Sequence, residues 1–138
     1  MSGDDVVPSP GPGPDAGPTH AALLAARALV VHDLAARGLD AAPVVDLVDA
    51  RVRERRWWLD AWPEGAEHVA GQVAQDVQEA LLDELGTRWP LCPLPHEDAP
   101  PSGREPHALH VLPDLGPDPH WVCEESGDAL APLGALPR

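Results

Sequence analysis

The pattern of apolar and polar positions predicts one well-defined amphipathic helix in the middle of the chain. Between residues 66 and 85 apolar side chains recur at helical spacing, while glutamine, aspartate and glutamate occupy the opposite side. Glu64 and Glu67 stand at the start, where the helix dipole favours negative charge, and Gly86 supplies a stop. The apolar stripe consists of Ala66, Val69, Ala70, Val73, Val77, Ala80, Leu81 and Leu85. A stripe of this width needs a partner surface to cover it.

A second helix is expected nearer the N-terminus, over residues 20–37. Thr19 is a suitable N-cap before an alanine-rich run, and Gly38 marks the end of the helix. Leu23, Val30 and Leu34 share one face of this segment.

The segment 44–62 is compatible with two kinds of structure. Val44, Val48 and Val52 have helical spacing, and Pro43 suits the first turn of a helix. However, its valine and tryptophan runs, and the alternation of residues 52–58, favour a strand. We predict a strand, bent or broken near Asp49, on which the amphipathic helix packs.

The segment after Trp89 is too rich in proline for a long helix. Short strands are predicted at 108–112 and 120–124, joined as a hairpin by the seven-residue loop 113–119, with a third strand at 129–133. The predicted fold class is therefore α+β. One amphipathic helix packs on a small antiparallel sheet, a zinc-ribbon-like β-hairpin forms the C-terminal part, and an extra helix lies near the N-terminus.

Length, composition and charge predict the cellular compartment and disfavour one class of partner. The chain has 138 residues, which suits one domain, here residues 19–138, and residues 1–18 form a Pro/Gly/Asp-rich tail that we expect to be disordered. The acidic N-terminus lacks the features of a secretory signal, and no apolar run is long enough for a membrane span. We therefore expect a cytoplasmic protein with reduced thiols. A net charge of −14 makes nucleic acid an unfavourable partner, because it repels phosphate.

Cysteine and histidine residues around the predicted hairpin suggest a metal site. Cys92, His96, His107 and Cys123 form a set of soft donors of the kind that zinc takes in a tetrahedron, with His110, His120 and Asp128 as alternates for the fourth position. A proline-laden module of this size has little apolar area to bury, so a structural zinc ion would stabilise it. The alternative is that Cys92 and Cys123 are ordinary buried thiols.

The same residues resemble a motif set found in a group of small uncharacterised actinobacterial proteins. Those proteins share WPxCPxH, a later HPL, a WxC and an ending close to IGxL. The matching residues here lie in Trp89–Pro93, His107–Leu109, Trp121–Cys123 and 131–136, within a likeness that covers about residues 50–136. The resemblance implies the same four ligand-type positions and no known activity. This chain departs from the pattern by His107-Ala in place of His-Pro and by an insertion, Glu97 to Pro106.

No motif of a known enzyme class is present. The sequence lacks H-E-x-x-H, G-x-S-x-G and a phosphate-binding glycine loop. We therefore expect a non-enzymatic interaction or accessory protein with an unidentified protein partner, and keep a minimal zinc-dependent hydrolase as the alternative. A second alternative is a single-stranded nucleic-acid binder built on a basic-aromatic patch comprising Arg53, Arg55, Arg56, Trp57 and Trp62. We prefer a structural role for these arginines, which would neutralise the acidic helix 66–85, although an exposed Trp57 or Trp62 would mark a protein-binding surface.

Overall fold

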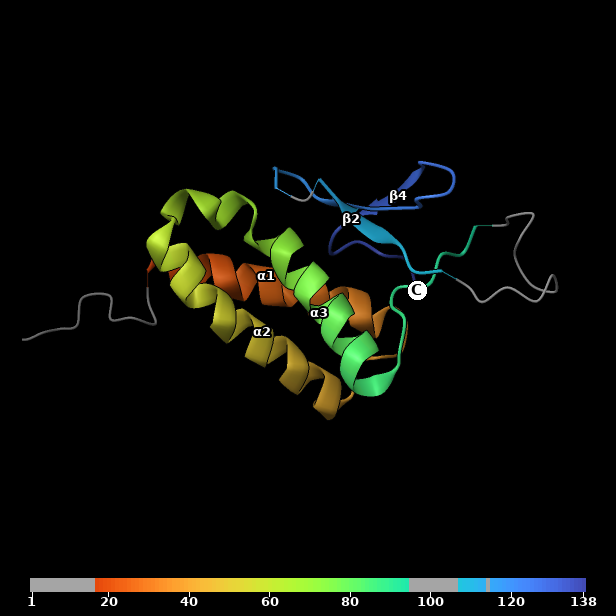
Figure 1. The fold of residues 1–138 in the computed structure, drawn as a ribbon, viewed down its shortest axis with the longest axis horizontal. Coiled ribbons are helices and arrows are strands. Elements are labelled where there is room, and N and C mark those ends of the chain that lie inside the picture. Colours follow the sequence, from red (N-terminus) through yellow and green to blue (C-terminus); the bar gives the residue numbers. More distant parts are fainter. Residues whose placement is uncertain (1–16, 95–106, 114) are drawn as a thin grey trace, which may run out of the picture.

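A computed structural model describes residues 17–94, 107–113 and 115–138 of the chain. The first half forms the helices α1 (Pro18–Ala35), α2 (Ala42–Ala61) and α3 (Val69–Leu85), with a 3₁₀ helix η1 (Pro63–Glu67) before α3. The second half forms strands β2 (His110–Leu112), β3 (His120–Val122) and β4 (Ala129–Pro132). The three helices pack against one another, and the sheet lies beside α3, away from α2 (Figure 1). The architecture is α+β, as predicted.

The prediction of a strand over 44–62 is wrong, because this segment is the helix α2. Pro43 lies in its first turn, and Val44, Val48 and Leu59 are buried at helical spacing. The β-propensity of valine and tryptophan is outweighed by packing, since α2 contacts both α1 and α3 along its length. The sheet is therefore built only from the C-terminal part of the chain.

Helix α1 forms where it was predicted but begins differently. It starts at Pro18 with Gly17 as the N-cap, so Thr19 lies inside the first turn and caps nothing with its side chain. The turn after α1 ends at Gly38, whose φ of +72° is the left-handed conformation that glycine adopts without strain. Gly38 thus ends the segment, as predicted, two residues after the C-cap Ala36.

Helix α3 contacts the sheet partly through its polar side chains. The middle of the predicted apolar stripe is buried, namely Val69, Val73, Val77, Ala80 and Leu81, with Ala70 half-buried. Its two ends, Ala66 in η1 and Leu85, are exposed, and Gly86 ends the helix in a left-handed conformation. The side-chain amide of Gln78 donates to the carbonyl oxygens of Trp89 and Leu109, at 3.0 and 2.7 Å. One side of the predicted polar face therefore binds backbone that leads into the sheet rather than facing only water.

The three strands form an antiparallel sheet in the order β2–β3–β4. The predicted hairpin is present, with Val111 opposite Trp121 and the loop 113–119 between its strands. Val111, Trp121 and Ala131 are buried and lie in register across the sheet, so their shared face packs on the helices. This arrangement places the residues that follow β3 beside the segment that precedes β2.

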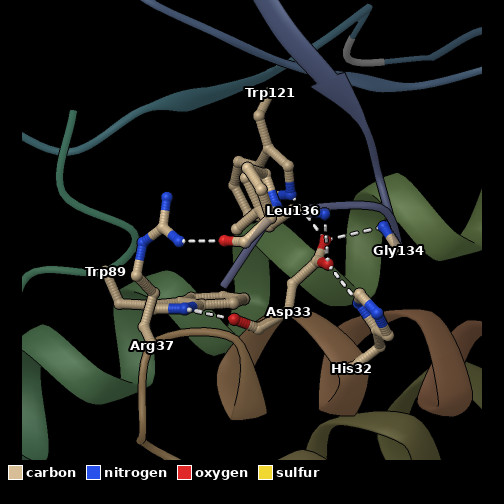
Figure 2. A network of polar contacts seen from close by, with 8 residues as sticks. His32, Asp33, Arg37, Trp89, Trp121, Gly134 and Leu136 are labelled. Carbon is tan, nitrogen blue, oxygen red and sulfur yellow. Dashed lines mark hydrogen bonds and ion pairs between the residues drawn. The ribbon is translucent and has the colours of Figure 1, made fainter. Parts of the chain in front are cut away.

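A fully buried carboxylate joins α1 to the C-terminal part of the chain. Oδ2 of Asp33 accepts hydrogen bonds from the indole of Trp121 and the backbone N–H of Gly134, at 2.7 and 2.6 Å. Oδ1 accepts from the backbone N–H of Leu136, at 3.0 Å, and from the His32 ring, at 2.8 Å (Figure 2). Several donors satisfy this charge, as a carboxylate removed from water requires.

Trp89 also contacts Asp33, next to Trp121. The indole of Trp89 donates to the backbone carbonyl of Asp33, and its ring packs edge-on against Trp121 with centroids 5.1 Å apart. Both rings are buried. Because Trp89 precedes Cys92 by three residues and Trp121 precedes Cys123 by two, this contact also fixes the two segments that carry the cysteines.

Parts of the chain for which predictions were made lie outside the described residues. They are residues 1–16 of the predicted tail, His96 and the insertion 97–106.

Within the described ranges, no helix has both the length and the apolar character needed to cross a bilayer.

Candidate metal centre

Two sulfur atoms and one imidazole converge where the hairpin meets the segment that precedes it. Cys92, His107 and Cys123 each offer one ligand atom, and these atoms all lie within 4.8 Å of one another. Nε2 of His107 is 3.5 Å from Sγ of Cys123. Neither cysteine forms a disulfide, and Cys123 is buried whereas Cys92 is half-buried. This cluster of two cysteines and a histidine could hold a metal ion.

Backbone pairing brings the first two members of the cluster together. Leu91 and Ala108 form an isolated antiparallel bridge, and the N–H of Cys92 donates to the carbonyl of His107 at 2.9 Å. The N–H of Leu109 donates in turn to the carbonyl of Pro90. Cys92 and His107 are therefore neighbours across a short ladder, although fourteen residues separate them in the sequence.

A tight turn places the third member. Cys123 directly follows β3, where its N–H donates to the carbonyl of Asp128 and its carbonyl accepts from the N–H of Gly127. Gly127 has a φ of +78°, so the turn uses a backbone conformation that favours glycine. The turn holds the buried Sγ of Cys123 facing the His107 ring.

The pKa values of the two thiols are shifted in opposite directions. Burial raises the pKa of Cys92. Burial by itself also raises the pKa of Cys123, but hydrogen bonds from Ser126, His107 and Cys92 outweigh it and lower this pKa to about 6. Cys123 is thus a thiolate at neutral pH, which is the form that binds metals.

A carboxylate stands behind the histidine. Oε2 of Glu125 lies 3.4 Å from Nδ1 of His107, whereas Nε2 faces Cys123. In metal sites a carboxylate at this position fixes the tautomer and orientation of the ligating ring. The sequence offered little sign of this role, because Glu124 and Glu125 look alike there. The structure separates them, since Glu124 pairs with His110 instead, at 2.9 Å.

Three of the four predicted ligands come together, and the fourth, His96, lies outside the described residues. The proposed alternates are elsewhere. His110 is exposed beside Glu124, and Nδ1 of His120 contacts the carbonyl oxygen of Asp118. The exposed Asp128 contributes its backbone to the turn, and its carboxylate is not among the atoms of the cluster.

The residues of the predicted basic-aromatic patch have different surroundings in the structure. On a helix successive residues are about 100° apart, so the residues that alternated as a strand point in different directions on α2. Arg55 forms a two-pronged ion pair with Asp76 of α3, at 2.6 and 2.9 Å, and Arg56 lies 3.3 Å from His20. Arg53 is exposed, while Trp57 and Trp62 are 69% and 38% exposed. The Arg55 pair agrees with the predicted neutralising role.

The sequence interpretation missed Asp33, which orients both cysteine-bearing segments through the two tryptophans. A signal was available, because Asp33 follows Val30 by three residues and precedes Leu34, and so lies on the apolar face of α1. An acidic residue on a buried face needs several donors, and buried tryptophan indoles are suitable partners.

Comparison with known proteins places the chain in a family but gives it no activity. A family model described as "Domain of unknown function (DUF8819)" matches residues 19–133, and the chain belongs to this family. No curated protein and no solved structure matches it. The matched range includes Cys92, His107 and Cys123.

Proposed function

For this member of a family of unknown function, we propose that Cys92, His107 and Cys123 bind a structural zinc ion, and that the protein is a non-enzymatic interaction or accessory module. The single observation that carries the proposal is the convergence of two sulfurs and an imidazole nitrogen within 4.8 Å. A buried cysteine by itself would need no such partners.

The donor types and their spacing support zinc. Thiolate and imidazole are the ligands of structural zinc sites, with Zn–S near 2.3 Å and Zn–N near 2.0–2.1 Å, so a sulfur and a nitrogen on one tetrahedral ion lie about 3.6 Å apart. The corresponding distance between Cys123 and His107 is 3.5 Å. The thiolate of Cys123 and the carboxylate of Glu125 behind His107 provide the charge state and the ring orientation that the ion requires.

The location of the cluster supports a structural role. Its members come from the segment after α3, the start of the hairpin and the turn after β3, so one ion would tie three parts of the C-terminal region together. These strands are only three or four residues long, and such short elements gain much from a metal tie. The fourth ligand that we propose is His96, as the sequence predicts.

One observation favours the alternative of a zinc-dependent hydrolase. Only three ligands are present among the described residues, and three protein ligands with one open position is the arrangement of catalytic zinc. Against it, Glu125 faces the ring of a ligand rather than a fourth position. A structural site therefore accounts better for the geometry.

Metal analysis of the untagged protein, purified in reductant, tests the proposal. We expect about one zinc ion per chain, lost in Cys92→Ser and Cys123→Ser but retained in His110→Ala, because His110 lies outside the cluster. Absence of stoichiometric metal in the wild type, together with a melting curve that chelator does not change, would overturn it.

Cobalt substitution then separates the two kinds of site. A closed site with His96 as a ligand gives a tetrahedral cobalt spectrum that azide does not perturb, and His96→Ala makes it sensitive to azide. Sensitivity to azide in the wild type would instead support the hydrolase.

A further inference from the structure

Residues of α2 and α3 line a groove of about 410 Å³. Helix α2 lies on the side of the bundle away from the sheet (Figure 1). The lining residues of the groove come from these two helices alone and belong to neither the metal cluster nor the Asp33 network. They are Arg51, Glu54, Arg55, Trp57, Trp58, Asp76, Glu79, Ala80, Asp83 and Glu84. The groove thus combines aromatic rings with charged side chains.

The charges in this groove are unbalanced. Five lining residues are acidic and two are arginines, which leaves a formal charge of −3. Both arginines already face carboxylates, since Arg55 pairs with Asp76 and Arg51 lies 3.3 Å from Glu54. Among the described residues Glu79, Asp83 and Glu84 form no direct salt bridge, although the charge of Glu79 also acts on Arg55. Glu79 and Asp83 lie four residues apart on one face of α3, and Glu84 lines the groove beside them. Their carboxylates are complementary to a positively charged ligand.

Trp57 adds an aromatic surface to the same groove. It is 69% exposed, the most of any large apolar side chain described, whereas the neighbouring Trp58 packs against the core. The guanidinium of Arg55 lies over the ring of Trp58, 5.2 Å from its centroid, and also binds Asp76. Arg55 thus contacts an indole ring and a carboxylate at the same time. A guanidinium from a partner could make the same two kinds of contact with Trp57 and the acidic residues of α3.

We propose that this groove is a docking site for an arginine- or lysine-containing segment of a partner protein. A basic side chain would stack on Trp57 and approach the carboxylates of Asp83, Glu84 and Glu79 on α3. The net charge of −14 would speed the approach of such a partner. Single-stranded nucleic acid does not fit, because its phosphates would face the groove's excess of carboxylates.

The groove inference extends the interaction role proposed above but does not depend on the metal. None of the lining residues is a ligand, and α2 does not touch the sheet. Loss of zinc binding in the cysteine variants would leave the groove intact, and failure of the groove to bind would leave the metal site intact. The two proposals can therefore fail separately.

Indole N–H signals of the ¹⁵N-labelled full-length protein provide the test. The chain has five tryptophans, and Trp57→Phe identifies the signal of Trp57. We expect a short arginine-containing peptide to shift that signal in a saturable way at about 150 mM salt, where long-range attraction is screened. A citrulline peptide of the same sequence, which keeps the shape but lacks the charge, should not shift it.

Matched variants separate the groove from the overall charge. Trp57→Ala, and the double change Glu79→Gln with Asp83→Asn, should each weaken peptide binding about tenfold. Glu64→Gln with Glu67→Gln removes the same charge from exposed positions of η1 that do not line the groove, and should leave affinity within about twofold. Equal weakening in both double variants, no saturable shift with the arginine peptide, or a comparable shift with single-stranded DNA would overturn the proposal.

Discussion

Trp121 donates its indole N–H to Oδ2 of Asp33 at 2.7 Å, although the two residues are 88 positions apart. This contact joins the middle strand of the sheet to the first helix (Figure 2). Cys123 follows Trp121 by two residues, so one short segment carries both a contact with the buried carboxylate and a member of the Cys/His cluster. In the segment before the hairpin, Trp89 donates to the backbone carbonyl of Asp33, and Cys92 follows it by three residues.

The Asp33 contacts also hold the C-terminal segment. The backbone N–H groups of Gly134 and Leu136 both donate to this carboxylate. These hydrogen bonds hold the C-terminal segment against α1.

Replacing Asp33 with asparagine should strongly destabilise the protein. Each carboxylate oxygen accepts two hydrogen bonds, and an amide NH₂ in either orientation would face donors instead. We expect a loss of about 3–5 kcal/mol in the free energy of unfolding, measured by urea denaturation. His32→Ala removes one partner whose side chain is half exposed, and should cost less than about 1 kcal/mol. Similar costs for the two changes would contradict this role for Asp33.

Chelation should lower the melting temperature of the wild type but should not change that of Cys92→Ser or Cys123→Ser. If one ion joins Cys92 and Cys123, its removal should cost about 3 kcal/mol or more, roughly 10 °C in melting temperature. Cys92→Ser and Cys123→Ser should melt near the chelated wild type, with no further change on adding chelator. A further decrease in either variant would mean that the two cysteines stabilise the fold independently of a shared ion.

The thiol of Cys123 should titrate well below that of an ordinary cysteine in the metal-free protein. Thiolate absorbance at 240 nm should rise with a midpoint near pH 6, and this step should be absent in Cys123→Ser. Because the folded pKa is below the unfolded value, the unfolded chain binds an extra proton between these two values. The free energy of unfolding should therefore increase from about pH 6 to about pH 9 and decrease as pH falls through 6. A pH profile unchanged in Cys123→Ser would refute this assignment.

Adding a methyl group at Gly134 should cost more than adding one at Gly86. Both glycines have positive φ, +91° and +64°, which an alanine adopts only with strain. A Cβ at Gly134 would also overlap the side chain of Leu29, whereas nothing lies within 4 Å of the corresponding position at Gly86. We expect Gly86→Ala to cost about 1 kcal/mol and Gly134→Ala about 3 kcal/mol, measured by thermal or urea denaturation. Equal costs would show that Leu29 moves aside freely.

The cluster of Cys92, His107 and Cys123 could be predicted in part from local sequence. Cys92, His107 and Cys123 are soft donors next to predicted strand ends, and their residue types alone suggest a common ligand. Sequence could not separate His107 from His110 and His120, because all three flank the same hairpin. His107 is the histidine that joins the cluster because the bridge between Leu91 and Ala108 places it beside Cys92.

The sequence by itself determined the elements whose signals are local. The apolar stripe of α3, the glycine stops after α1 and α3, and the turn-rich loop between β2 and β3 each depend on neighbouring residues, so they could be located correctly. Tertiary structure alone decided the rest. Segment 42–61 is helical because two other helices cover it, and Asp33 is tolerated because donors from distant parts of the chain converge on it. Neither outcome follows from local propensity, since each is stabilised by contacts that exist only after the chain has folded.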